Sequence, residues 1–167
     1  GTRYAALDDE RAARGAHVWL SSRKPQDCEP VAAAIRAAGG QATVHGCHIG
    51  DPEQIEALFA AIRAQHGRLD ILVNNAATNP YFGPVVDTDL GAFQKTVDVN
   101  IRGYFLMSQQ GARLMLAQRR GSIVNVASVA GVTPSALRGI YSITKAAVIS
   151  MTKSFAKELA PQKVRVN

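Results

Sequence analysis

The 167-residue sequence has little cysteine, no long apolar run and no basic cluster, and each of these shortages excludes a class of protein. Cys28 and Cys47 are the only cysteines and lack C-x-x-C spacing, so we expect two free thiols in a reducing cytoplasm. The longest uncharged run, residues 121–137, contains Asn125 and Pro134 and is shorter than the ~20 apolar residues of a membrane span. Residues 1–16 lack the apolar core of a signal peptide. We therefore expect a cytoplasmic protein with no membrane segment.

Basic residues outnumber acidic residues but are scattered along the chain. The 19 Lys and Arg residues against 13 Asp and Glu residues give a net charge of +6. Nucleic-acid sites gather their cations, whereas here the only adjacent basic pairs are Arg23–Lys24 and Arg119–Arg120, and no aromatic residues are interleaved with the basic residues around either pair. We expect no nucleic-acid partner. The four histidines show no metal-ligand spacing, so we expect no metal site.

The chain is composed and patterned like one α/β domain spanning residues 1–167. Hydrophobic residues make up 47% of it, enough for a sizeable core. Short apolar runs predict strands at residues 16–21, 43–47, 69–73, 122–126 and 163–167. Helical periodicity and capping residues predict helices at residues 30–38, 52–66, 89–118 and 139–159. Strands that alternate with helices indicate a doubly wound parallel sheet, so the expected fold is Rossmann-like, with three αβα layers.

Tyr141 and Lys145 lie four residues apart at the start of the last predicted helix. This spacing places both side chains on one helical face. A nearby ammonium favours the ionised form of a phenol, which suits the phenol to proton transfer near neutral pH. The pair alone is a weak signal, because an exposed tyrosine beside a solvated lysine has the same spacing.

Other polar residues follow the predicted strands at the same edge of the sheet. Ser128 comes just after strand 122–126, and Asn74 and Asn75 come after strand 69–73. Open parallel sheets bind ligands at the carboxyl ends of their strands. Asn100 lies inside the long helix 89–118, where asparagine is mildly unfavourable because its side chain competes for backbone hydrogen bonds.

Taken together, these motifs resemble the short-chain dehydrogenase/reductase family. The family's order is Asn-Asn-Ala after a strand, Asn in the next helix, Ser, and then Tyr-x-x-x-Lys, and the likeness runs from about residue 15 to residue 167. Within the family, the amino-acid sequence is most similar to that of carbonyl-reductase-like members at residues 21–24, 47–50 and 79–83. The resemblance implies reversible hydride transfer between NAD(P)(H) and a small carbonyl or alcohol substrate.

The resemblance also implies a role for each matching catalytic residue. Tyr141 would be the general acid/base, and Lys145 would assist it and hold the nicotinamide ribose. Ser128 would orient the substrate oxygen. Asn100 would position a water in a proton relay to Lys145.

Further positions match residues that bind the cofactor in this family. Asn74 and Ala76 would line the cofactor groove, with Ala77 where the family more often has glycine. His48 stands where the family typically has an aspartate that contacts adenine, and Ile49 follows it. The complete implied set is Ser22, Arg23, Lys24, His48, Ile49, Asn74, Ala76, Tyr141 and Lys145.

Residues 22–24 bear on the choice of cofactor. NAD-preferring relatives usually carry an acidic residue at the position of Ser22, whereas Arg23 suits a 2′-phosphate. Arg23 could instead stack on adenine, as it can in NAD users. We favour NADP(H) over NAD(H).

The chain departs from the family at both ends. Residues 1–14 contain one glycine in place of the strand and Thr-Gly-x-x-x-Gly-x-Gly loop of the family. The sequence also stops before the family's last strand and substrate loop. Either it is a partial chain, with a fold incomplete at both ends, or it is a degenerate member that acts as a catalytically silent scaffold through subunit association. The intact catalytic residues favour the first.

The helices at residues 89–118 and 139–159 are apolar over more than one stripe, which predicts a partner subunit. The first carries Phe93, Val97, Ile101, Tyr104 and Phe105 on one flank and Leu106, Met107, Leu114 and Met115 around it. The second has a small-residue face at Ala146, Ala147, Ile149, Ser150, Lys153 and Ser154. Since relatives pair through these helices, we expect a homodimer or homotetramer.

Overall fold

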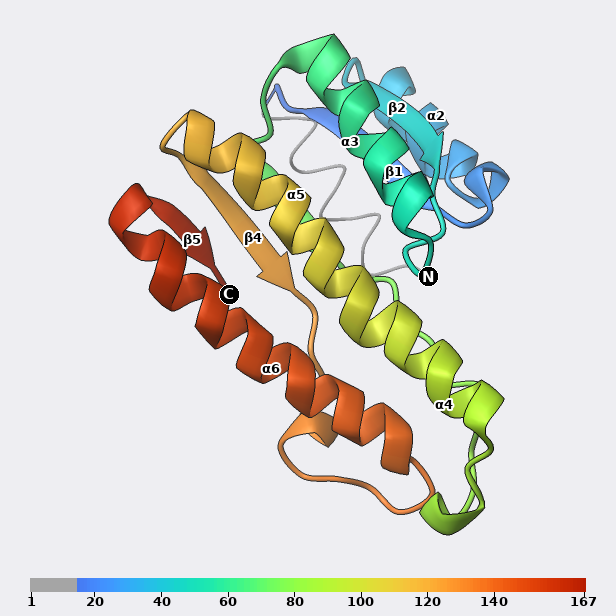
Figure 1. Ribbon diagram of the computed structural model, residues 1–167. Coiled ribbons are helices and arrows are strands. Elements are labelled where there is room, and N and C mark those ends of the chain that lie inside the picture. The colour runs from blue at the N-terminus through green and yellow to red at the C-terminus, as the bar shows by residue number, and fades with distance from the viewer. Residues whose placement is uncertain (1–14) are drawn as a thin grey trace. The chain divides into compact units, whose positions relative to one another are not determined.

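The structure is a computed structural model that describes residues 15–167 (Figure 1). The expectation that residues 1–14 hold no strand and no glycine-rich loop falls outside the described residues. The chain divides into two compact units, one ending at His48 and the other beginning at Ile49. Each unit is an assembly of parallel strands and helices, which agrees with the predicted α/β class.

The first unit is a two-stranded sheet with a helix on one face. Its elements are β1 (His17–Ser22), a 3₁₀ turn (Pro25–Asp27), α2 (Glu29–Ala37) and β2 (Gln41–Gly46). The strands pair in parallel from His17 opposite Gln41 to Ser22 opposite Gly46. Leu20 of β1 packs on Ala32 and Ile35 of α2, and these buried side chains form the core of the unit.

The second unit contains a three-stranded parallel sheet in the order β3-β4-β5. Its α-helices and strands are α3 (Pro52–His66), β3 (Ile71–Asn74), α4 (Leu90–Val97), α5 (Tyr104–Ala117), β4 (Gly121–Asn125), α6 (Gly139–Leu159) and β5 (Val164–Val166). Short 3₁₀ turns lie at Val85–Asp87, Val129–Gly131 and Ala160–Gln162. Figure 1 shows α5 and α6 running side by side, and α5 packs against β4 while α6 packs against β5. The core between them includes Tyr104, Met115, Ile123 and Val148, all fully buried.

Helix α3 begins and ends where the sequence predicts. The Asp51 carboxylate accepts hydrogen bonds from the backbone N–H groups of Glu53 and Gln54, and Pro52 takes the first helical position, where no N–H is needed. Gly67 ends the helix at φ +64°, a left-handed conformation that glycine adopts without strain. These local signals determine where the helix begins and ends, and its apolar face, which includes the buried Ile55, Leu58 and Phe59, packs into the core.

The long helix predicted for residues 89–118 is interrupted by a π-helical segment, Asp98–Gly103, between α4 and α5. This corrects the expectation of one regular helix. A π turn carries more residues than an α turn, so the faces of α5 are rotated relative to those of α4. As a result Leu114 and Met115, expected around the helix surface, are buried in the core, as is Tyr104.

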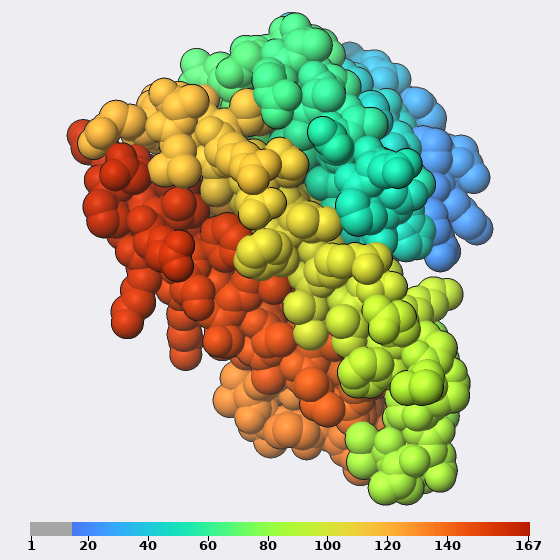
Figure 2. Space-filling view, viewed as in Figure 1, coloured from blue at the N-terminus to red at the C-terminus, as the bar shows by residue number. Residues whose placement is uncertain are grey.

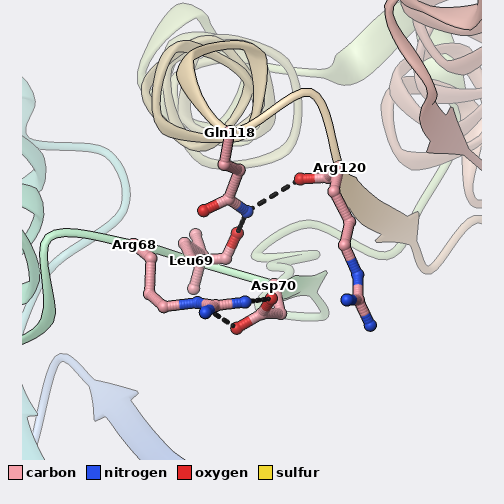
Figure 3. A network of polar contacts seen from close by, with 5 residues as sticks. All are labelled: Arg68, Leu69, Asp70, Gln118 and Arg120. Atoms are coloured by element: carbon pink, nitrogen blue, oxygen red, sulfur yellow. Dashed lines mark hydrogen bonds and ion pairs between the residues drawn. The ribbon is translucent and has the colours of Figure 1, made fainter.

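The amino ends of β3 and β4 are joined to the end of α5 by one side chain (Figure 3). The Gln118 amide donates hydrogen bonds to the backbone carbonyls of Leu69, at 2.6 Å, and Arg120, at 2.7 Å. Beside it, the exposed Arg68 guanidinium forms a two-bond ion pair with Asp70. Gln118 thus holds together three segments at the sheet edge opposite the strands' carboxyl ends.

No helix within residues 15–167 is both long enough and apolar enough to cross a membrane.

Candidate active site

Lys145 is buried beside Tyr141 in the amino-terminal half of α6. The Lys145 side chain is only 1% exposed, and its Nζ donates a 2.7 Å hydrogen bond to the backbone carbonyl of Val126. The same Nζ lies 5.8 Å from the centre of the Tyr141 ring and 5.1 Å from that of Tyr104. The Tyr104 hydroxyl donates to the same Val126 carbonyl, at 3.2 Å. The structure therefore brings the two sequence-predicted residues together around one cation.

Burial lowers the pKa of Lys145, because removal from water disfavours the charged form of an amine. The carbonyl of Val126 and the faces of the two aromatic rings oppose this effect, since both attract a cation. The arrangement can hold a positive charge close to the Tyr141 ring with little freedom to move.

Ser128 lies on a loop that packs directly against α6. Its Oγ accepts a hydrogen bond from the Ala130 backbone N–H at 3.2 Å and so begins the 3₁₀ turn Val129–Gly131. At Gly131 a Cβ atom would lie 2.7 Å from the backbone carbon of Lys145. Only glycine allows this approach, so Gly131 sets the Ser128 loop against the turn of α6 that carries Lys145. The sequence analysis assigned Gly131 no role and missed this contact.

The Asn100 side chain joins three segments and is fully buried in the π-helical segment. Its Oδ1 accepts from the Thr78 backbone N–H at 2.9 Å, and its Nδ2 donates to the Thr78 carbonyl and to the Thr144 hydroxyl, both at 3.0 Å. Both hydrogens of the amide are used by protein partners. Its expected role in holding a relay water stays a prediction.

The π-helical segment also holds the residues that follow His48. Arg102 donates to the Gly50 carbonyl at 2.8 Å and forms an ion pair with Asp98 at 3.0 Å. A Cβ atom on Gly103 would collide with the backbone carbonyl of Ile49. Gly103, a glycine inside a predicted helix, was the sequence signal that another segment approaches closely here, and the sequence analysis assigned it no role. Ile49, one of the expected cofactor-binding residues, is therefore packed against the segment that carries Asn100.

Asn74 turns its side chain into the interior. It is 2% exposed, and its Nδ2 donates to the Ser108 hydroxyl at 3.0 Å and to Asn125 Oδ1 at 2.9 Å. Asn125 in turn donates to Thr152 on α6. The Asn74 amide thus joins strand ends to helices, whereas Ala76, also expected at the cofactor groove, is exposed two residues later.

The expected cofactor-selecting residues lie at the end of β1, in the first unit. Ser22 Oγ accepts from the Lys24 backbone N–H at 3.2 Å, which forms a tight turn with the exposed Arg23 at its tip. His48 is half-buried at the end of the same unit. The donor set fits a phosphate-bearing ligand, because Arg23 and Lys24 present two exposed cations beside a hydroxyl. Within residues 15–167 no three His, Cys, Asp or Glu side chains gather closely enough to hold a metal ion.

The described part of the chain thus has parallel strands with flanking helices, a Ser on one strand-end loop and a Tyr-x-x-x-Lys pair on the next helix. A sequence model of the short chain dehydrogenase family matches residues 5–167, and the chain belongs to this family. It is 41% identical over 162 residues to dehydrogenase/reductase SDR family member 4 of Oryctolagus cuniculus, a match that covers 97% of this chain and 62% of that protein. The chain spans about three fifths of the length of the curated relatives it matches.

Solved structures agree with this assignment. A metagenomic short-chain oxidoreductase in complex with NADP superposes with a TM-score of 0.93 and 34% identity, over 98% of this chain and 74% of that one. NAD⁺-bound xylitol dehydrogenase gives a TM-score of 0.93 and 30% identity, over 98% of this chain and 63% of that one. These similarities confirm the family and the Rossmann-like α/β fold expected from the sequence.

Proposed function

We propose that this chain carries the catalytic core of an oxidoreductase that interconverts a small carbonyl compound and a secondary alcohol with NAD(P)(H). The observation that carries the proposal is the buried ammonium of Lys145, fixed on the Val126 carbonyl and 5.8 Å from the Tyr141 ring centre. Lysine is almost never fully buried without a partner, and here its charge is placed beside a phenol that can exchange a proton. When bound, the nicotinamide supplies or accepts the hydride.

Each residue of the site has a role that its contacts support. The Tyr141 hydroxyl gives its proton to the substrate oxygen during reduction and takes it back during oxidation. Lys145 stabilises the phenolate that remains on Tyr141. The Ser128 hydroxyl uses its oxygen to accept from Ala130, which leaves its own hydrogen to donate to the substrate oxygen.

NADP(H) is the proposed cofactor. Ser22 offers no carboxylate to oppose a 2′-phosphate, and Arg23 is an exposed cation next to it that can form two parallel hydrogen bonds to phosphate. Similar structures contain NADP in one case and NAD⁺ in another, which supports a nicotinamide cofactor of either kind. The preference therefore rests on residues 22–24 of this chain.

Self-association through α4, α5 and α6 is proposed as well. These helices form an uncovered face of the second unit (Figure 2). Leu90 is 83% exposed, and Phe93, Phe105 and Ile143 are each at least 43% exposed. A hollow of about 460 Å³, lined mainly by apolar side chains including Val85 and Ile143, adjoins α6. So many exposed apolar side chains on one face favour its burial against a second copy of the chain, in a homodimer or homotetramer. Light scattering would detect the dimer or tetramer by its mass.

The test compares Tyr141→Phe with Tyr81→Phe in the purified chain. Tyr81 is a matched control, because its hydroxyl donates to the Pro84 carbonyl, and burial, together with Asp87 and Asp89, raises its pKa and keeps it neutral. Tyr141→Phe should reduce NADPH-dependent turnover of a simple ketone such as acetophenone at least ~10²-fold, while Tyr81→Phe retains it. Equal turnover in wild type and Tyr141→Phe would contradict the proposal.

A further inference from the structure

Thr144 is fully buried on α6 and lies between the two proposed catalytic residues in the sequence. It lies three residues after Tyr141 and directly before Lys145, so it shares the Tyr141 side of the helix. Its hydroxyl donates a 2.8 Å hydrogen bond to the backbone carbonyl of Tyr141. A threonine within a helix commonly bonds back to its own helix in this way, so this contact alone assigns no role.

The second bond of the Thr144 hydroxyl is the informative one. Asn100 Nδ2 donates to Thr144 Oγ1 at 3.0 Å, so the hydroxyl both donates to α6 and accepts from the π-helical segment. The Asn100 amide can have only one orientation here, because its Oδ1 must face the Thr78 N–H and its Nδ2 the Thr78 carbonyl. A continuous series of hydrogen bonds therefore runs from Thr78, after β3, through Asn100 and Thr144 to the backbone of Tyr141.

We propose that Thr144 is a positioning residue, whose hydroxyl uses the Asn100 amide to fix the rotation of α6 and so holds Tyr141 and Lys145 at the site. The proposal rests on the proposed function of these two residues. Without the Thr144 hydroxyl, Asn100 loses its hydrogen bond to α6, which lies on the side of the helix that carries Tyr141. Lys145, which bonds the Val126 carbonyl, directly follows Thr144 on the same helix. A small rotation of α6 would therefore displace the side chains of both Tyr141 and Lys145.

The same helix offers a matched control. Thr152 also donates to its own helix, to the Val148 carbonyl at 2.8 Å, and also accepts from an asparagine, Asn125 Nδ2, at 3.0 Å. It lies about two turns beyond Thr144, and its partner Asn125 bonds the Asn74 side chain rather than Asn100. Thr152→Val and Thr144→Val therefore remove the same kind of bond pair, and only the second should affect Tyr141 and Lys145.

The experiment uses NMR of the purified chain and does not require it to be active. Thr144→Val should shift the ring resonances of Tyr141 and the side-chain resonances of Lys145. It should also raise hydrogen exchange at the Thr78 backbone N–H about tenfold, since Asn100 is held less firmly. Thr144→Ser, which keeps the hydroxyl, should resemble wild type, and Thr152→Val should leave all three signals in place. If Thr144→Val does not fold, Thr144→Ala carries the same comparison.

Wild-type signals in Thr144→Val, or changes no larger than those in Thr152→Val, would overturn the positioning role. In the kinetic comparison, Thr144→Val should reduce kcat for ketone reduction with NADPH about tenfold and leave KM for the ketone within about twofold. A wild-type chain that neither binds NADPH nor reduces a ketone would remove the proposed function, whereas the NMR comparison would still decide whether Thr144 positions the two side chains.

Discussion

The Lys145 ammonium is bonded to the backbone carbonyl of Val126, the first residue after β4, at 2.7 Å. Because Ser128 follows two residues later, one hydrogen bond joins the helix with the Tyr-x-x-x-Lys pair to the loop with the expected substrate-orienting serine. The bond crosses from helix to strand end and leaves the ammonium in contact with the Tyr141 and Tyr104 rings. A cation fixed in this way supports the proposed role of Tyr141 in proton transfer.

Stability should depend on pH through Lys145. Burial lowers its pKa from the ordinary value of 10.5, so between the lowered pKa and 10.5 the unfolded chain binds a proton that the folded chain does not. The free energy of unfolding of the wild type should therefore rise with pH across this window. Lys145→Met removes the titration, so urea unfolding at a series of pH values should show the wild type gaining stability relative to the variant. Lys153→Met, at an exposed lysine, is the control. A difference in unfolding free energy between wild type and Lys145→Met that stays the same at every pH would contradict the prediction.

Arg23→Ala should weaken binding of NADPH more than binding of NADH. Loss of a charged hydrogen bond to a 2′-phosphate costs about 1.5–3 kcal/mol, or roughly 10- to 100-fold in Kd, and NADH lacks that phosphate. Fluorescence titration with each cofactor measures the difference. Arg63→Ala removes an exposed charge from α3 and should change neither affinity. Equal losses for both cofactors would mean that Arg23 only stacks on adenine.

Gly131→Ala should disturb the site although the change is a single methyl group. The new Cβ would lie 2.7 Å from the Lys145 backbone carbon, so the Ser128 loop or α6 must move, at a cost of about 1–3 kcal/mol in unfolding free energy. Gly46→Ala is the matched change, since its Cβ would meet only the Pro25 side chain at ordinary contact distance. Thermal unfolding compares the two. Similar melting temperatures would show that the Ser128 loop yields freely.

Gln118→Ala should destabilise the second unit and leave the site chemistry alone. It removes the bonds to the Leu69 and Arg120 carbonyls, worth about 1–2 kcal/mol together. Gln94→Ala, which removes an exposed bond to Asp98, should cost less than ~0.5 kcal/mol. Urea unfolding monitored by circular dichroism measures both free energies. Equal costs would mean that the Gln118 bonds drawn in Figure 3 contribute no more to stability than an exposed bond.

The sequence predicted those parts of the fold that local signals determine. The cap at Asp51 and the glycine at Gly67 bound α3 correctly, and the prediction for residues 139–159 matches α6. The spacing of Tyr141 and Lys145 also predicted that both would meet, because i and i+4 share a helical face.

The remaining features depend on contacts between segments far apart in the chain. Two residues of the π-helical segment make long-range contacts: Asn100 bonds Thr78, and Gly103 lies close to Ile49. No periodicity within residues 89–118 reports either contact, so the buried positions of Leu114 and Met115 were assigned to the wrong face. The Gly131 contact was missed for the same reason.

The most direct test labels the hydride of the proposed reaction and removes its proposed proton donor. The purified chain is given NADPH that carries deuterium at the transferred position of the nicotinamide, together with acetophenone, and the alcohol is analysed by mass spectrometry. We expect deuterium on the carbinol carbon with the wild type, and we expect that alcohol to form at least ~10²-fold more slowly with Tyr141→Phe. Equal rates with the two proteins, or no deuterated alcohol from the wild type, would contradict this expectation.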